Sequence, residues 1–182
     1  MTPKHPLTLT VYLQSTKAPW TTLLMVKAGQ RPESLVRPPT GFALRVIKGA
    51  KCQATAGLLT ECARALDFPD YFGHNWDALE ECLADLEWLP AKGYILLITD
   101  AAQVLPNDED EYETFLEILS DAGEAWGNGQ AGMGTRRATP FHVLFAVSER
   151  EKAKRAHWGM KEITAEPART PGIRRRAPSK RP

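Results

Sequence analysis

The fold of this chain is decided by residues 66–90, which read LDFPDYFGHNWDALEECLADLEWLP. Pro69 ends the helical pattern that precedes it, and Gly73 allows an unusual backbone turn. Asn75 is a good N-cap for the helix that follows, because its side-chain oxygen can accept a hydrogen bond from an unpaired backbone N–H. Asp77 then lies in the first turn, where the helix dipole favours a negative charge. The stretch therefore predicts a shaped loop that leads into a capped helix.

The predicted helix carries its charges on one side. Asp77, Glu80 and Glu81 are three and four residues apart, so their carboxylates share a face. The apolar side chains lie on the other side: Trp76, Leu79, Leu83 and Leu86. Carboxylates clustered on one face repel one another, which weakens the isolated domain slightly. A sequence that tolerates this repulsion is expected to have a cationic partner that receives the carboxylates.

Apolar patterning on both sides of this stretch predicts an α/β fold. Strands are expected where apolar residues run continuously, and helices where they recur every three or four positions. The predicted strands are residues 42–47, 94–99 and 141–147, and the predicted helices are residues 55–66, 75–86 and 111–123. Strands that alternate with helices imply a small, mainly parallel three-stranded sheet packed with helices.

Composition divides the chain into an N-terminal extension (1–40), an α/β domain (41–150) and a basic C-terminal tail (151–182). Within the extension, residues 7–13 alternate like a strand and residues 21–27 form a possible second strand. A Pro/Gly-rich linker is expected over residues 28–40, and a Gly-rich loop over residues 125–140. The tail is Pro-rich and nearly free of apolar residues, so disorder is expected from about residue 165.

A net charge of +1 conceals strong segregation of charge along the chain. Residues 41–124 carry five Lys or Arg against seventeen Asp or Glu, which makes this block strongly acidic. Residues 125–182 carry thirteen Lys or Arg against four acids, and residues 1–40 carry five against one. An acidic block within a folded region attracts cationic partners and accelerates their encounter.

Residues 69–79 (PDYFGHNWDAL), followed by Glu81, Cys82 and Leu83, strongly resemble the signature of the barstar family of intracellular ribonuclease inhibitors. That signature is a proline, an acidic residue, two aromatics, a glycine, any residue, an asparagine, and a helix that opens with Asp-Ala-Leu. It appears here without gaps. The resemblance continues more weakly from residue 42 to residue 147 and implies a binding protein with no catalysis of its own.

In that family the loop and helix that carry this motif insert into the ribonuclease active site. By position, Tyr71 would cover the catalytic histidine of the enzyme, and Gly73 would let the backbone approach closely. Asp77 and Glu81 would present carboxylates to the cations that hold the substrate phosphate, and Asp121 would add an acidic contact. The remaining implied contact residues are Phe72, Asn75 and Glu80.

The chain departs from the family pattern within the motif helix. Glu80 and Glu81 stand where the family commonly has tryptophan and aspartate, and Asp121 is shorter than the usual glutamate. Glu81 keeps the charge on a longer side chain, whereas Glu80 exchanges an aromatic contact for a second charge. We therefore do not expect tight binding to barnase itself.

Composition also argues against several other classes of protein. No apolar run approaches the roughly 18 residues that span a bilayer, and the N-terminus lacks the pattern of a signal peptide. Three cysteines without Cys-x-x-Cys spacing suit a reducing cytoplasm and argue against disulfides or a zinc site. The histidines have no metal-like spacing, so we expect no metal, cofactor or catalytic residue.

The resemblance favours an inhibitor of a basic, secreted-type ribonuclease that is monomeric when free and contacts neither nucleic acid nor membrane. A second hypothesis is a hydrolytic enzyme that uses Glu81 or Asp77 with His74, although its acidic surface would repel RNA. A third is a barstar-fold regulatory or interaction protein whose acidic face binds a different basic partner. Without the motif, the acidic helix would be interpreted as an ordinary solvated face.

Overall fold

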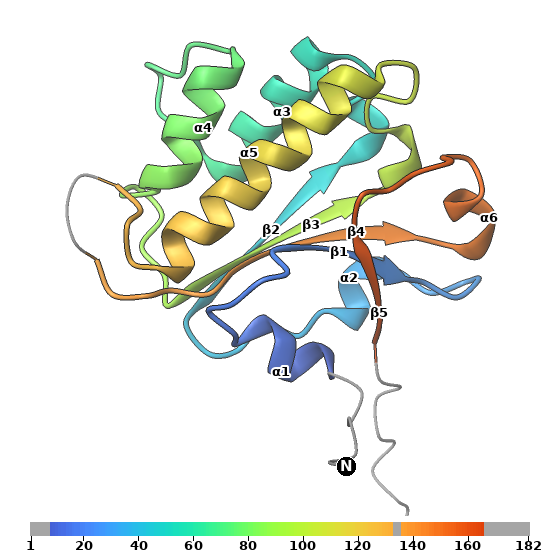
Figure 1. The fold of residues 1–182 in the computed structure, drawn as a ribbon, viewed down its shortest axis with the longest axis horizontal. Helices are drawn as coiled ribbons and strands as arrows, with labels where there is room; N and C mark the ends of the chain where they lie inside the picture. Colours follow the sequence, from blue (N-terminus) through green and yellow to red (C-terminus); the bar gives the residue numbers. More distant parts are fainter. Residues whose placement is uncertain (1–7, 133–135, 166–182) are drawn as a thin grey trace, which may run out of the picture.

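Five parallel strands form the centre of a computed structural model that describes residues 8–132 and 136–165 (Figure 1). The strands are β1 (Thr21–Met25), β2 (Phe42–Lys48), β3 (Gly93–Thr99), β4 (Phe141–Val147) and β5 (Lys161–Thr164). They lie side by side in the order β2-β3-β4-β1-β5, and every neighbouring pair is parallel. The α/β class and the parallel sheet predicted from the sequence are therefore confirmed.

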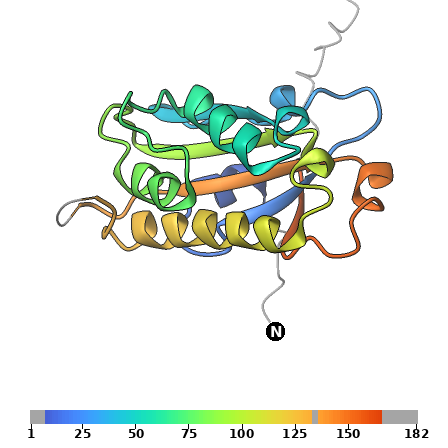
Figure 2. The same cartoon turned by 90° about the horizontal axis from the view of Figure 1, so that it is seen from above.

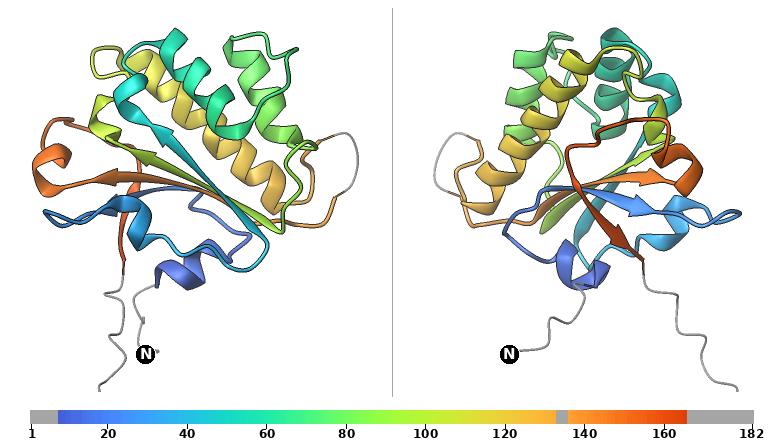
Figure 3. Two further views of the ribbon diagram at one scale, coloured as in Figure 1. Left: turned by 180° about the vertical axis from the view of Figure 1, so that it is seen from behind. Right: turned by 45° about the vertical axis from the view of Figure 1, so that its right-hand side comes forward.

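Helices cover both faces of the sheet (Figures 1 and 2). One face carries α3 (Thr55–Leu66), α4 (Trp76–Asp85) and α5 (Glu109–Gly127), and the opposite face carries α1 (Leu9–Leu13) and α2 (Pro32–Leu35). Short helical turns follow three strands: Gly49–Lys51 after β2, Ala101–Gln103 after β3, and α6 (Glu149–Lys152) after β4. Figure 3 shows the same two helical layers from behind and from the side.

The two faces of the sheet bury separate apolar layers. Leu96 and Ile98 of β3 pack with the layer under α3, α4 and α5, whereas Ile95 and Leu97 pack with the layer under α1 and α2. All seven residues of β3 and all seven of β4 are buried. Because both faces of these strands are covered, their sequences are continuous apolar runs, as expected for a parallel sheet.

The prediction of a three-stranded sheet is wrong, because β1 and β5 extend the sheet to five strands. β1 lies inside the sheet between β4 and β5, within the segment predicted to hold a possible strand at residues 21–27. β5 falls in the basic tail and buries only Ile163, so no apolar run marks it in the sequence. Residues 166–182, where disorder was predicted, lie outside the described residues.

Residues 7–13 were predicted as a strand, but Leu9–Leu13 form the helix α1. The Thr8 side chain caps this helix, and its buried residues Leu9, Tyr12 and Leu13 follow helical spacing, while Val11 is exposed. The expected linker over 28–40 contains α2, and α5 extends past the predicted helix over 111–123 at both ends. The expected loop at 125–140 therefore begins only after Gly127.

Trp20 joins the N-terminal segment to α5. A methyl group built on Gly123 would lie 2.4 Å from the Cγ atom of Trp20, and one on Gly127 would lie 2.3 Å from its Cη2 atom. Neither position leaves room for a β-carbon, so these glycines form a notch in α5 that receives the indole ring. The segment before β1 thus supports α5 directly.

We predict that Gly123→Ala destabilises the protein by about 1–3 kcal/mol, because the added methyl group overpacks the notch. In a Trp20→Leu background the smaller side chain leaves space, so the same change should cost clearly less. Denaturant unfolding of the two single variants and the double variant measures this coupling. Strictly additive effects would contradict the notch.

His142 is a fully buried histidine on β4. Its Nε2 atom lies 2.8 Å from the carbonyl oxygen of Ser15, and its ring packs against Tyr12 at a centroid distance of 4.2 Å. Since a carbonyl only accepts, Nε2 carries the hydrogen, and Nδ1 has no partner among the described residues. Burial lowers the pKa of His142 below its ordinary value, although the hydrogen bond to the carbonyl of Ser15 opposes this.

We predict that the free energy of unfolding falls as the pH drops from 7 to 5. The unfolded chain binds a proton near the ordinary histidine pKa of about 6.5, whereas folded His142 binds it only at lower pH. In His142→Gln the side-chain amide can still donate to Ser15 but does not titrate. Its pH dependence should be shallower, while the exposed control His157→Gln keeps the parental slope; equal slopes in all three proteins would contradict the prediction.

Candidate functional site

The loop between α3 and α4 presents one aromatic side chain and buries the next. Tyr71 is 73% exposed, whereas Phe72 is 7% exposed and packs against Phe68 at a ring-centroid distance of 4.9 Å. Phe72 was predicted as a contact residue, but its side chain lies in the apolar layer beneath the loop, where aromatic packing is most favourable. Phe72 therefore supports the loop, and Tyr71 projects from it.

The turn before α4 differs in one detail from the sequence prediction. The left-handed conformation falls on His74, with a φ of 50°, and not on Gly73. A β-carbon on Gly73 would lie 3.2 Å from Asn75 Nδ2 and 3.5 Å from Ala78 Cβ, so Gly73 provides close approach of the backbone. Asn75 is the N-cap as predicted: its Oδ1 accepts from the N–H of Ala78 at 2.8 Å.

The first half of α4 carries uncompensated negative charge. Asp77, Glu80 and Glu81 are exposed, and none forms an ion pair with a residue that the structure describes. At the other end of α4, Asp85 and Glu87 both pair with Arg136, at 3.2 and 3.0 Å. Negative charge thus remains free where the motif begins and is neutralised where the helix ends.

Two indole N–H groups tie α4 to α5. Nε1 of Trp76 donates to Oε2 of Glu111 at 2.8 Å, and Thr55 of α3 donates to the same oxygen at 2.8 Å. Near the other end of α4, Nε1 of Trp126 donates to the carbonyl of Leu83 at 2.8 Å. The sequence analysis missed this role of Glu111, because no local signal in the sequence links it to Trp76.

The last carbonyls of α4 are also satisfied. Leu86 adopts a left-handed conformation with a φ of 46°, and its N–H donates to the carbonyl of Cys82. Nη1 of Arg136 donates to the carbonyl of Asp85 at 2.8 Å, and Nε1 of Trp126 donates to the carbonyl of Leu83. With a side-chain cap at its start and donors at its end, α4 is held as a rigid element.

Helix α5 packs beside α4 and adds further carboxylates (Figure 2). Asp121, the predicted acidic contact, is exposed and forms no ion pair with a described residue. Beyond the first turn of α5, three other exposed acids share these properties: Glu113, Glu117 and Glu124. We call the exposed carboxylates of Asp77, Glu80, Glu81 and these four α5 residues the acidic face.

Nearby acidic side chains affect the pKa of Tyr71. Desolvation, and then the nearby carboxylates of Asp85 and Glu87, raise the pKa of its phenol above the ordinary value. The hydroxyl therefore stays protonated at neutral pH and can both donate and accept a hydrogen bond.

The hypotheses of a metal site and of a hydrolase were compared with the described residues. Residues 8–132 and 136–165 contain no group of three or more His, Cys, Asp or Glu side chains that could hold a metal ion. His74 is exposed and forms no hydrogen bond with Asp77 or Glu81 in this part of the chain, as the hydrolase hypothesis would require. No helix within the described residues is long and apolar enough to cross a membrane.

A protein-family model matches this chain and shows the family to which it is related. The family model described as Barstar (barnase inhibitor) matches residues 42–146, more than half of the 182 residues. The chain belongs to this family. A comparison with curated proteins gives no match.

The barstar match begins with β2 and ends within β4, so it contains the loop, α4 and α5 of the acidic face. It leaves out β1, β5, α1 and α2. The matched region therefore contains only three of the five strands, β2, β3 and β4. Members of the barstar family are inhibitors of ribonucleases and not enzymes.

We predict that Glu111→Ala destabilises the protein by about 1–3 kcal/mol, because Trp76 and Thr55 both lose their acceptor. The control is Glu113→Ala, on the same helix but without a hydrogen bond to a described side chain, which should change stability by at most about 0.5 kcal/mol. Denaturant unfolding measures both values, and hydrogen exchange should show faster opening of α4 in the first variant only. Equal effects would mean that Glu111 does not fix α4.

Proposed function

We propose that this protein inhibits a ribonuclease by inserting the Tyr71 loop and the acidic side of α4 into the cationic active site of that enzyme. The observation that carries the proposal is the rigid α4, with three unpaired carboxylates in its first half, inside the region that matches the barnase-inhibitor family. The proposal requires occlusion only and no chemistry by the inhibitor.

The complementarity is that of a phosphate mimic. A site that cleaves phosphodiesters holds its substrate with arginine and lysine, and a carboxylate can accept the same charge-assisted hydrogen bonds. Asp77 and Glu81 are the residues proposed to do so, with Asp121 as a further contact. Tyr71 is exposed and aromatic, so it can cover the catalytic histidine, while Gly73 keeps the loop backbone close to the enzyme.

The electrostatics of the whole domain support fast association. The acidic block of residues 41–124 contains every carboxylate of the acidic face. A basic ribonuclease would therefore be attracted before contact. The barnase–barstar pair is itself the standard example of such steering. Since Glu80 replaces an aromatic contact with charge, the partner is proposed to be a basic, secreted-type ribonuclease that differs from barnase in this part of its site.

The setting proposed for this activity is the cytoplasm, with the free protein as a monomer. Cys52, Cys62 and Cys82 are all buried and free, which suits a reducing compartment. Burial raises the pKa of the Cys52 thiol to about 12 and that of Cys62 well above its usual value, so neither is a reactive thiolate at neutral pH.

The test is inhibition of RNA cleavage by a panel of basic, barnase-type ribonucleases, titrated with the purified full-length protein. For the enzyme that is inhibited most strongly, Glu81→Gln and Asp77→Asn should each weaken binding by about 2–5 kcal/mol, because each leaves an enzyme cation without its partner. The matched control is Glu33→Gln on α2, which removes the same charge from the other face of the sheet. It should leave the inhibition constant within about twofold, since it touches no partner.

Two outcomes would overturn the proposal. Inhibition that survives in both α4 variants would mean that the acidic face is not the contact surface. Failure to inhibit any ribonuclease of the panel, together with binding of some other basic protein, would favour the regulatory or interaction protein of the third hypothesis.

A further inference from the structure

A groove of about 1110 Å³ lies between α1, α2 and the ends of β1 and β5, across the sheet from α4 and α5. Its apolar lining residues are Leu9, Leu13, Met25, Val26 and Leu35. Every residue that lines it falls outside residues 42–146. The groove is therefore built wholly from the parts of the chain that the barstar match leaves out, and the ribonuclease proposal gives it no role.

The charged side chains of the groove are mostly cationic. Lys27, Arg37 and Arg150 line it, are exposed, and form no ion pair with a residue that the structure describes. Glu149 is the single acid among the described residues that line the groove. An apolar groove bordered by unpaired cations is complementary to an occupant that is both apolar and acidic.

The ends of the chain do not supply such an occupant. Residues 166–182 carry six Lys or Arg against one acid, Glu166. Residues 1–7 contain Lys4 and His5 and no acid. The positive charge of both segments disfavours them as ligands of a cationic rim.

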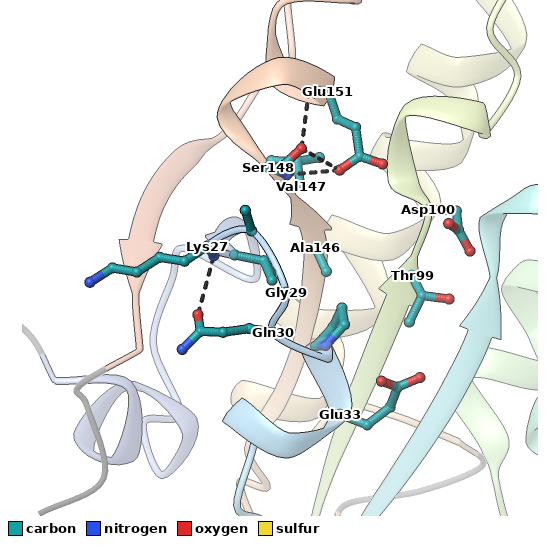
Figure 4. Close-up of a pocket in the computed structure, with 13 residues that line it drawn as sticks. Lys27, Gly29, Gln30, Glu33, Thr99, Asp100, Ala146, Val147, Ser148 and Glu151 are labelled. Atoms are coloured by element: carbon teal, nitrogen blue, oxygen red, sulfur yellow. Dashed lines mark hydrogen bonds between the residues drawn. The ribbon is translucent and has the colours of Figure 1, made fainter.

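A smaller pocket of about 330 Å³ adjoins the groove and carries acidic side chains (Figure 4). Glu33 and Asp100 line this pocket, and in Figure 4 the side chain of Lys27 points away from both carboxylates. Glu151 also lines the pocket, and its carboxylate accepts a hydrogen bond from the N–H of Ser148 in the capping box of α6. An acidic occupant is therefore repelled from the pocket and directed to the side of the groove that holds the cations.

We infer that the groove binds an acidic segment of a partner protein, with its apolar side chains on the leucine-lined floor and its carboxylates at Lys27, Arg37 and Arg150. A single-stranded nucleic acid is disfavoured, since none of the described residues that line the groove is aromatic and could stack on a base. A bilayer surface is disfavoured because the site is concave. Because α4 and α5 lie on the opposite face of the sheet, the groove can be filled while the acidic face holds a ribonuclease (Figure 3).

The test uses the full-length protein and a fluorescein-labelled amphipathic peptide of glutamate and leucine, with a lysine–leucine peptide of the same pattern as its control. Fluorescence anisotropy should detect binding of the acidic peptide only. The double variant Arg37→Glu/Arg150→Glu places like charges against the peptide and should weaken binding by at least about tenfold. Lys92→Glu, at an exposed lysine that lines neither pocket, should weaken it by less than about twofold.

The double variant should still inhibit a ribonuclease as the parent does, which separates this inference from the proposed function. Thermal unfolding should show that it is folded, since neither arginine has an ion pair among the described residues to lose. The inference is overturned if the acidic peptide does not bind, or if Lys92→Glu weakens binding as much as the double variant. It is also overturned if single-stranded RNA or vesicles containing phosphatidylglycerol bind through these arginines in preference to the peptide.

Discussion

The acidic face depends on how α4 is fastened to α5. Exposed carboxylates on the first half of α4 repel one another and gain nothing from local ion pairs in the part of the chain that the structure describes. The helix keeps its place because the indole of Trp76 donates to Glu111 and the indole of Trp126 donates to the carbonyl of Leu83. Bonds at both ends resist rotation as well as separation of the two helices. A binding surface fixed in this way loses little conformational entropy when a partner docks.

Helix α5 is in turn supported by a segment that the barstar match leaves out. Trp20 fills the notch at Gly123 and Gly127, and the chain then enters β1, which lies between β4 and β5 inside the sheet. A parallel strand in the interior of a sheet contributes backbone hydrogen bonds on both edges, so β1 is part of the core structure. The residues before position 42 therefore do two things: they complete the sheet that carries the acidic face, and they form most of a separate cationic groove.

Local and periodic features could be predicted from the sequence. β4 and α3 have the predicted bounds, and Asn75 caps α4 as its residue type indicates. The positions of Asp77, Glu80 and Glu81 on one exposed side also follow from helical spacing. These predictions depend only on residues within one or two turns of each other, where propensity and periodicity are most informative.

Features that depend on contacts between distant residues could not be predicted in this way. β5 has one buried side chain, so only its pairing with β1 makes it a strand. The α1 sequence alternates like a strand, and burial of Tyr12 against His142 accompanies its helical form. The bond between Trp76 and Glu111 spans 35 positions, and the left-handed turn falls on His74 although the glycine stands before it. In β5 and α1 a tertiary contact outweighs the local preference of the sequence.

The central claim is that carboxylates of α4 take the place of the substrate phosphate in a ribonuclease. Competition tests it most directly: the complex of the full-length protein with its ribonuclease is titrated with a nucleotide 3′-phosphate that occupies the phosphate subsite, and release is followed by calorimetry. The account predicts mutual exclusion, with the apparent dissociation constant of the inhibitor rising in proportion to the nucleotide concentration. A ternary complex, in which nucleotide and inhibitor bind the enzyme together with unchanged affinities, would contradict it.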